Sequence, residues 1–191
     1  MLQMSPRAAA GAAILLCSLA PRVAADPASD LASALAQYPA LSNLRSLVNQ
    51  NPTLVNSIVG NSKNLTVLAP SNEAFSGYAT AHDGQALGNA TTEFITNTLS
   101  YHILAGGLRY DSISESGLGL TVPTLLTGEL YNNRSAGPSL AAAFGPGANG
   151  QVVYVTKSSD GFLQIQASQE HVNLTALDKS WSGGVVQLVD K

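Results

Sequence analysis

The stretch that decides the fold of this chain reads Thr66-Val67-Leu68-Ala69-Pro70-Ser71-Asn72-Glu73-Ala74-Phe75. Its first three residues suit a pleated, half-buried strand, and Pro70 ends that strand because it has no N–H to give to a ladder. Ser71 or Asn72 can then cap a helix, and we expect capping for Asn72 rather than contact with a ligand. Phe75 follows as the apolar anchor. The run predicts a strand–helix junction that packs in the core and carries no reactive group, which favours a binding function over catalysis.

Residues 1–25 have the composition of a secretory signal peptide. Arg7 supplies the positive charge, residues 8–20 form a short apolar run, and Val23-Ala24-Ala25 precedes a cut ahead of Asp26. That apolar run is shorter than the roughly 20 residues of a membrane-spanning helix. We therefore expect secretion with cleavage, the alternative being an uncleaved membrane anchor.

Cleavage would change the cysteine content and the charge of the chain. Cys17, the only cysteine, would be lost, so no disulfide could form. Residues 26–191 are numerous enough to bury one core without such a bond. Loss of Arg7 and Arg22 leaves seven Lys and Arg against twelve acidic residues, which moves the net charge from −3 to −5. Since no cluster of cations exists, we exclude nucleic acid as a partner.

Four tripeptides fit the acceptor rule for N-linked glycans, and their asparagines are Asn64, Asn89, Asn133 and Asn173. In a chain with a signal peptide we expect several of them to be occupied. Treatment with an N-glycanase should then shift the mobility of protein from a eukaryotic secretion host.

Helices are expected mainly ahead of residue 103. Three short ones are predicted over residues 30–37, 41–50 and 51–60 from apolar spacing and from their caps. Ser29 or Asp30 would cap the first, and Asn51 would cap the third with Pro52 at its first position. A fourth helix begins at Thr91 or Thr92, and residues 76–89 are expected to be loop with short helical turns.

Strands are expected from residue 103 onward. The candidates are residues 120–126, 152–156, 162–167, 171–174 and 185–189. Asp160-Gly161 predicts a hairpin turn between the second and third of them, and residues 131–150 are expected to form an exposed excursion. Helices followed by strands indicate an α+β domain.

Three segments, taken in order, resemble the fasciclin-like domain family of secreted and cell-surface adhesion proteins. They are the quoted run with Leu65 ahead of it, Ser100–Gly106 with its Tyr-His pair, and Gly183–Lys191. Thr124–Gly128 fits the stretch that the family places between the last two. The resemblance covers about residues 29–191. It implies a single domain, a β-wedge or sandwich of short strands with several short helices packed on it.

The resemblance also suggests site residues. The family ties the pair Tyr101 and His102 to fold integrity and to adhesion, and we favour the structural role because the residues around His102 are apolar. Asp190 lies close to the position of an acidic adhesion determinant in related animal domains. The chain ends at Lys191, inside what the family treats as its last strand. We expect a chain cut short there, the alternative being a natural terminus.

Searching for reactive chemistry yields little. Zinc-protease, nucleophile-elbow and Walker motifs are all missing from the sequence. Gly145–Gly150 fits Gly-x-Gly-x-x-Gly, but the strand and helix that this fingerprint needs are not predicted around it. We expect no catalytic residue, metal or cofactor. Trp181 is expected in the core, and Asp178 is expected to bond backbone beside the turn at 182–184.

These observations predict a non-catalytic interaction module, secreted or at the cell surface, acting in adhesion or in an extracellular matrix or wall. Its partner would be an extracellular protein or polysaccharide, with a membrane reached only through an anchor not visible in this chain. The acidic charge argues against electrostatic binding of anionic polysaccharides. Alternatives are a secreted hydrolase with an unrecognised active site, or a carrier of lipid or small ligands in an apolar cleft between helices and sheet.

Overall fold

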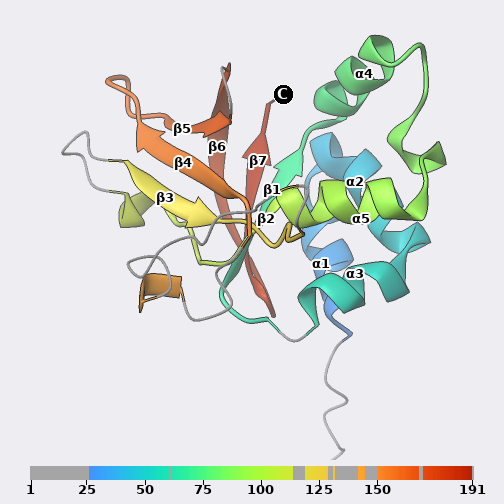
Figure 1. Ribbon diagram of the computed structural model, residues 1–191, viewed down its shortest axis with the longest axis horizontal. Helices are drawn as coiled ribbons and strands as arrows, with labels where there is room; N and C mark the ends of the chain where they lie inside the picture. Colours follow the sequence, from blue (N-terminus) through green and yellow to red (C-terminus); the bar gives the residue numbers. More distant parts are fainter. Residues whose placement is uncertain are drawn as a thin grey trace, which may run out of the picture.

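The computed structural model describes residues 26–60, 62–113, 119–128, 131, 142–144, 150–167 and 170–190 (Figure 1). The signal peptide predicted over residues 1–25 lies outside these residues. The helices are α1 (Pro27–Leu35), α2 (Ser42–Gln50), α3 (Pro52–Val59), α4 (Asn72–Ala81) and α5 (Thr92–Tyr101), with the 3-10 turns η1 (Pro39–Leu41), η2 (Leu87–Asn89) and η3 (Tyr110–Ser112). The strands are β1 (Leu65–Pro70), β2 (Ile103–Leu104), β3 (Leu120–Pro123), β4 (Val152–Lys157), β5 (Leu163–Ala167), β6 (Glu170–Trp181) and β7 (Gly184–Val189).

The first helix begins earlier than its sequence predicted. Pro27 occupies its first turn, where the missing N–H costs nothing, so the predicted caps Ser29 and Asp30 are wrong. Asp30 instead accepts a hydrogen bond from the backbone N–H of Ser182, at 2.6 Å. Asn51 precedes α3 as predicted, but its side chain donates to the Leu47 carbonyl rather than capping α3.

The helix that follows β1 is longer than predicted. Ser71 is its cap, with Oγ accepting from the backbone N–H of Ala74 at 3.1 Å. The helix then runs to Ala81, so the expected loop over residues 76–89 is wrong in its first part, whereas η2 is one of the expected short turns. Gly77 lies inside this helix, and one interior glycine costs a helix only about 1 kcal/mol. The cap and the apolar pair Phe75 and Tyr78 outweigh that cost.

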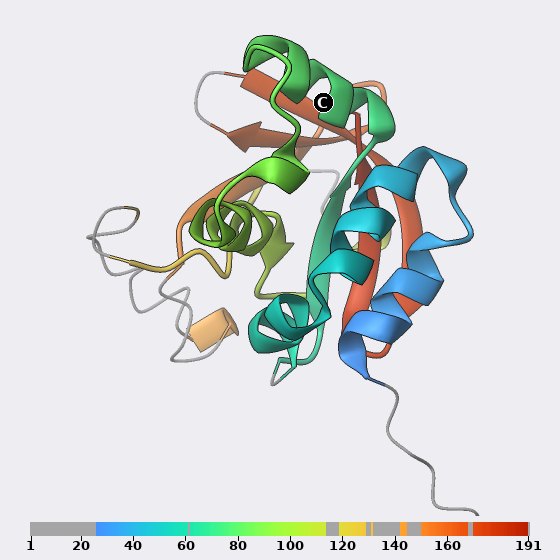
Figure 2. The ribbon, with the colours of Figure 1, turned by 90° about the vertical axis from the view of Figure 1, so that its right-hand side faces the viewer.

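The strands form a seven-stranded sheet in the order β2-β1-β7-β6-β5-β4-β3. β1 and β7 are parallel, and the other neighbours are antiparallel. The two edges meet, because Leu104 bridges Thr124 and the Ala105 N–H donates to the Pro123 carbonyl at 2.8 Å. The sheet therefore curls back on itself, and the α+β wedge with helices on one side is confirmed (Figures 1 and 2).

β1 is buried on both faces, so the prediction of a half-buried strand is wrong. Leu65, Val67 and Ala69 face the helices, and Leu68 faces the inside of the curled sheet. The reason is its position: Figure 2 shows α1, α2 and α3 over β1, β7 and the adjoining end of β6, while β3, β4 and β5 close around the opposite face. β1 thus separates two hydrophobic cores.

We call these the helix-side core and the barrel core. The helix-side core contains the buried residues Leu31, Leu35, Leu41, Leu44, Leu47, Val48, Val55, Val59, Val67, Ile95, Leu99, Ile103, Trp181 and Val186, among others. The barrel core contains Leu68, Leu104, Leu108, Ile113, Val122, Val153, Val155, Leu163, Ile165, Leu174 and Val189. Trp181 is therefore a core residue, as predicted.

The long strand β6 holds most of the differences from the predicted strands. It continues past the predicted end at Leu174, through a register shift between Thr175 and Lys179. Asp178 sits in that bulge with a φ of 43°, and its side chain accepts from Gln187 instead of bonding the turn at 182–184. The hairpin between β4 and β5 is confirmed, with Gly161 at a φ of 80°. β3 stops at Pro123, short of the predicted 126.

Candidate functional site

The three motifs of the sequence become three adjacent strands, β2, β1 and β7. The Leu68 N–H donates to the His102 carbonyl at 2.8 Å, and the Ser71 N–H donates to the Val189 carbonyl at 3.0 Å. The segment after β3 joins them, because the Leu125 N–H donates to the Ile103 carbonyl at 2.8 Å. Segments far apart in the chain therefore meet in one part of the fold.

Tyr101 and His102 are neighbours in sequence, but they face different cores. Tyr101 packs against the barrel core, where burial raises the pKa of its hydroxyl. His102 lines a cavity in the helix-side core. Their rings meet edge to face with centroids 6.0 Å apart. Side chains at the end of α5 therefore contact both cores.

The imidazole of His102 is held by its own helix. Nδ1 lies 2.8 Å from the Thr98 carbonyl oxygen, and a carbonyl only accepts, so Nδ1 carries the proton in this bond. Apolar surroundings lower the pKa of His102 below its ordinary value, and the bond to Thr98 opposes that shift. The ring is accordingly neutral at pH 7, with Nε2 as an acceptor.

Asn72 caps a helix, but not the one that it begins. Its Oδ1 accepts from the backbone N–H of Asn43 at 3.0 Å, in the first turn of α2, and its Nδ2 donates to the Pro39 carbonyl at 3.0 Å. The predicted role is correct in kind and wrong in partner, since Ser71 caps α4. Asn72 thereby ties the start of α4 to the start of α2.

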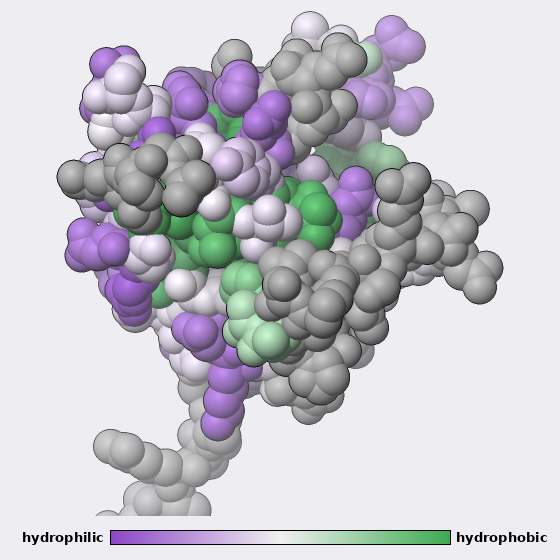
Figure 3. Space-filling view, turned by 60° about the vertical axis from the view of Figure 1, so that its left-hand side comes forward, coloured by the Kyte–Doolittle hydropathy of each residue, from purple (hydrophilic) through white to green (hydrophobic). Residues whose placement is uncertain are grey.

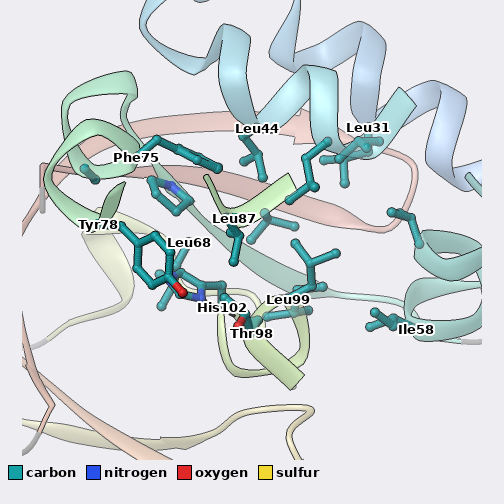
Figure 4. A pocket seen from close by; sticks show the side chains of 17 residues that line it. Leu31, Leu44, Ile58, Leu68, Phe75, Tyr78, Leu87, Thr98, Leu99 and His102 are labelled. Carbon is teal, nitrogen blue, oxygen red and sulfur yellow. Dashed lines mark hydrogen bonds between the residues drawn. The ribbon is translucent and has the colours of Figure 1, made fainter. Parts of the chain in front are cut away.

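Pro70 and Phe75 both line the cavity that His102 lines (Figure 4). It has a volume of about 180 Å³ and lies between β1 and helices from α1 to α5. Beyond Phe75, Leu47 and Leu87 lies a second hollow of about 320 Å³, between α2 and α4, which has a more polar lining. The sequence suggested an apolar cleft between helices and sheet, but it did not identify the residues around it.

The remaining predicted site residues lie apart. Asp190 is exposed just after β7 and is not among the residues that line the cavity beside His102. Asn64, Asn89 and Asn173 are all exposed, and Asn133 lies outside the described residues. The structure thus does not gather Tyr101, His102 and Asp190 into one site.

The three imidazoles are also dispersed. His82 bonds the Tyr78 carbonyl and stacks on the Tyr78 ring at 4.0 Å, and His171 is exposed on β6. Among the described residues, none of these rings is hydrogen-bonded to a serine or to a carboxylate. The same residues hold no group of three or more His, Cys, Asp or Glu side chains placed to bind a metal.

Sequence reasoning missed one surface, which we call the outer face of β4–β6. It carries the side chains of Tyr154, Thr156, Gln164, Gln166, His171 and Asn173, which alternate with core residues. Cross-strand pairing sets Tyr154 opposite Gln166 and Gln166 opposite His171. The period-2 pattern of these segments could have revealed it. At the adjoining edge Leu120, Val152 and Phe162 are exposed, and Figure 3 shows apolar surface among polar residues on that side.

A family model described as the fasciclin domain matches residues 39–191, so the chain belongs to the fasciclin domain family. A FAS1 domain-containing protein of Selaginella moellendorffii is 34% identical over 73 residues. That match covers 38% of this chain and only 25% of the relative.

Among solved structures, the chain resembles a FAS1 domain pair from the insect cell adhesion molecule Fasciclin I, with a TM-score of 0.53. The identity is 18%, and the match covers 81% of this chain and 45% of that one, so this likeness supports the fold alone. None of the helices in the described ranges combines the length and apolarity that a bilayer span requires.

Proposed function

We propose that this protein is a secreted or cell-surface interaction module that acts in adhesion or in an extracellular matrix or wall, without catalysis. Membership of the fasciclin domain family supports this role, as does the insect protein of similar fold, which is a cell adhesion molecule. The dispersed imidazoles of the described residues do not form a Ser-His-Asp triad, in which the histidine is bonded to both a nucleophile and a carboxylate.

The observation that carries the proposal is the outer face of β4–β6. Its six side chains are hydroxyl, amide, imidazole and phenol groups, and none of them is a lysine, an arginine or a carboxylate. Gln164 Nε2 donates to Asn173 Oδ1 at 3.1 Å between the neighbouring strands β5 and β6, which links the two amides. Such a surface offers hydrogen bonds and one aromatic face without strong charge. It suits a neutral polysaccharide, or a glycoprotein, better than an anionic one.

Glycosylation of Asn173 would change the access of a partner to this face. Asn173 is both a member of the face and a predicted glycan acceptor, and it is exposed. A glycan on Asn173 would stand over Gln164 and its neighbours, so occupancy of this one site would control access to the face. Partner binding should therefore depend on glycosylation.

The test is adhesion of cells and retention of neutral and acidic polysaccharides on wells coated with the secreted protein. We expect the protein to bind neutral glycans, and we expect Tyr154→Ala to lower this binding at least fivefold. Phe94→Ala is the control, because Phe94 is an exposed aromatic residue on α5. Asn173→Gln should strengthen binding if that glycan covers the face. Equal losses in Tyr154→Ala and Phe94→Ala would contradict this surface, and a serine-directed probe that labels one residue specifically would contradict the non-catalytic role.

A further inference from the structure

The cavity in the helix-side core is a partly open apolar pocket. Protein interiors are packed as densely as organic crystals, whereas this pocket leaves about 180 Å³ between β1 and the helices. Its walls are almost entirely aliphatic and aromatic, with Leu44, Val48, Val67 and Leu99 among them. An engineered apolar cavity of about 150 Å³ is known to stay dry and to bind benzene. A guest of one aromatic ring, or of similar bulk, therefore fits here.

The cavity has an apolar end and a polar end. Leu31, Val55 and Ile58 line it where α1 and α3 lie. Figure 4 shows His102 and Thr98 at a distance from Leu31 and Ile58, with the hydroxyl end of Tyr78 pointing toward His102. A guest with one polar group would thus enter with a defined orientation.

The chemistry at the polar end selects the polar group. Nδ1 of His102 donates to the Thr98 carbonyl, which leaves Nε2 as an acceptor without a bond among the described residues. No lysine or arginine lines the cavity, so a carboxylate would be buried without a counter-ion, which is costly. A hydroxyl satisfies Nε2 because it donates, and it carries no charge.

A route into the cavity passes Phe75. The side chains of Leu47, Phe75 and Leu87 line both the cavity and the hollow between α2 and α4. No residue of α4 is fully buried, so this helix is the least firmly packed wall. The cavity is itself partly open and adjoins the hollow at these side chains, so a guest reaches it without unfolding of either core.

We propose that the helix-side cavity is a binding site for a small neutral apolar molecule with one hydroxyl, such as a single-ring phenol or a medium-chain alcohol. The hydroxyl donates to Nε2 of His102, and the hydrocarbon part packs against Leu44, Val55 and Leu99. The site is separate from the outer face of β4–β6, so either can fail without the other.

Three ligands of similar size test the site on protein purified from a eukaryotic secretion host. p-Cresol, toluene and benzoate are titrated at pH 7 by calorimetry and by thermal shift. We expect p-cresol to raise the melting temperature and to bind at least about fivefold more tightly than toluene, and benzoate not to bind. Equal affinities for p-cresol and toluene, or preferred binding of benzoate, would overturn the hydroxyl assignment. No binding of either neutral ligand would overturn the site.

A filled cavity provides the matched control. Ala74 lines the cavity and Ala81 is exposed at the end of the same helix. Ala74→Leu should abolish p-cresol binding while the protein stays folded, and Ala81→Leu should leave binding unchanged. Unchanged binding in a folded Ala74→Leu variant would place the ligand elsewhere. If that variant does not fold, nuclear Overhauser contacts from p-cresol to Leu44 and Val55 in the parent decide, and their absence in the saturated complex overturns the proposal.

His102 is tested in the same way. His102→Phe should reduce the preference for p-cresol over toluene to about onefold, and His102→Gln, whose amide oxygen accepts, should restore part of it. A preference that persists in His102→Phe would assign the hydroxyl to another acceptor and contradict the role of Nε2.

Discussion

The two faces of β1 look onto cores that are built differently. On the barrel side, fully buried Thr66 and Gln187 lie among the aliphatic side chains, and both are hydrogen-bonded. On the helix side, the core is lined almost wholly by apolar groups and yet leaves a cavity of about 180 Å³. A sheet that closes on itself presses side chains from several strands together, whereas α4 covers the helix side with residues that are at most partly buried. The barrel core is therefore closely packed and hydrogen-bonded, whereas the helix-side core contains free space.

The largest effect is expected on the barrel side, at Gln187. Its Nε2 donates to the Leu108 carbonyl at 2.8 Å and to Asp178 Oδ1, while its Oε1 accepts from the Asp178 N–H at 3.1 Å. Gln187→Ala removes these bonds, leaves the Leu108 carbonyl without its buried donor and opens a void, so we expect a loss of about 4 kcal/mol in the free energy of unfolding. Urea denaturation measures it. Gln166→Ala, an exposed amide, should cost less than about 0.5 kcal/mol, and a similar small cost at Gln187 would contradict a barrel core that depends on polar bonds.

A pair of enlargements compares the two cores directly. Val155 is fully buried in the barrel core, and Val55 lines the cavity. Val155→Phe must push neighbours aside and should destabilise the protein by about 1–3 kcal/mol. Val55→Phe can extend into the free space and should change stability by less than about 1 kcal/mol. Thermal unfolding followed by circular dichroism gives both values, and equal losses would mean that the cavity does not exist in solution.

Acid should lower the stability of the folded protein through protonation of His102, which lies on the helix side of β1. Histidine in an unfolded chain titrates near pH 6.5, and burial lowers the pKa of His102 in the folded protein. As pH falls below about 6.5 the unfolded state binds the proton first, so stability decreases, by at most about 1.4 kcal/mol per pH unit, until the folded pKa is passed. Unfolding curves between pH 7.5 and 5 should show this slope. His102→Gln should make it shallower, and an unchanged slope in that variant would assign the acid sensitivity to other groups.

The smallest effects concern the caps that hold the helices over the cavity. Ser71 caps α4 and Asn72 caps α2. Ser71→Ala and Asn72→Ala should each cost about 1 kcal/mol, measured by urea denaturation. The two residues cap different helices, but they are neighbours and Asn72 also holds the start of α4, so the double variant should lose more than either single variant and less than their sum. A double loss no larger than either single loss would mean that both side chains serve one helix.

Several features were predictable because they depend on neighbours in sequence. Pro70 ends β1, Thr91 begins α5, and Asp160-Gly161 turns the β4–β5 hairpin, as local backbone chemistry dictates. The fasciclin fold itself was evident from three short segments. Three of the errors share a cause: Asn72, Asp30 and Asp178 each bond a partner outside their own element, which periodicity and capping rules cannot supply.

The outer face of β4–β6 could be predicted from the sequence only in part. Its alternating pattern is visible in the sequence, but the grouping of its uncharged side chains on one surface depends on which strands pair and in which register. The glycan acceptor Asn173 could be found from its tripeptide, whereas its position on that face could not.

By itself, the sequence determined the order of helices and strands, the breaks between them, the acidic charge and the glycan acceptors, because propensity, capping and covalent motifs act over a few residues. Only the tertiary structure decided that β1 is buried on both sides, that Tyr101 and His102 turn into different cores, and that space remains beside His102. Those outcomes depend on how closely distant segments can approach one another, and packing of that kind is a property of the whole chain.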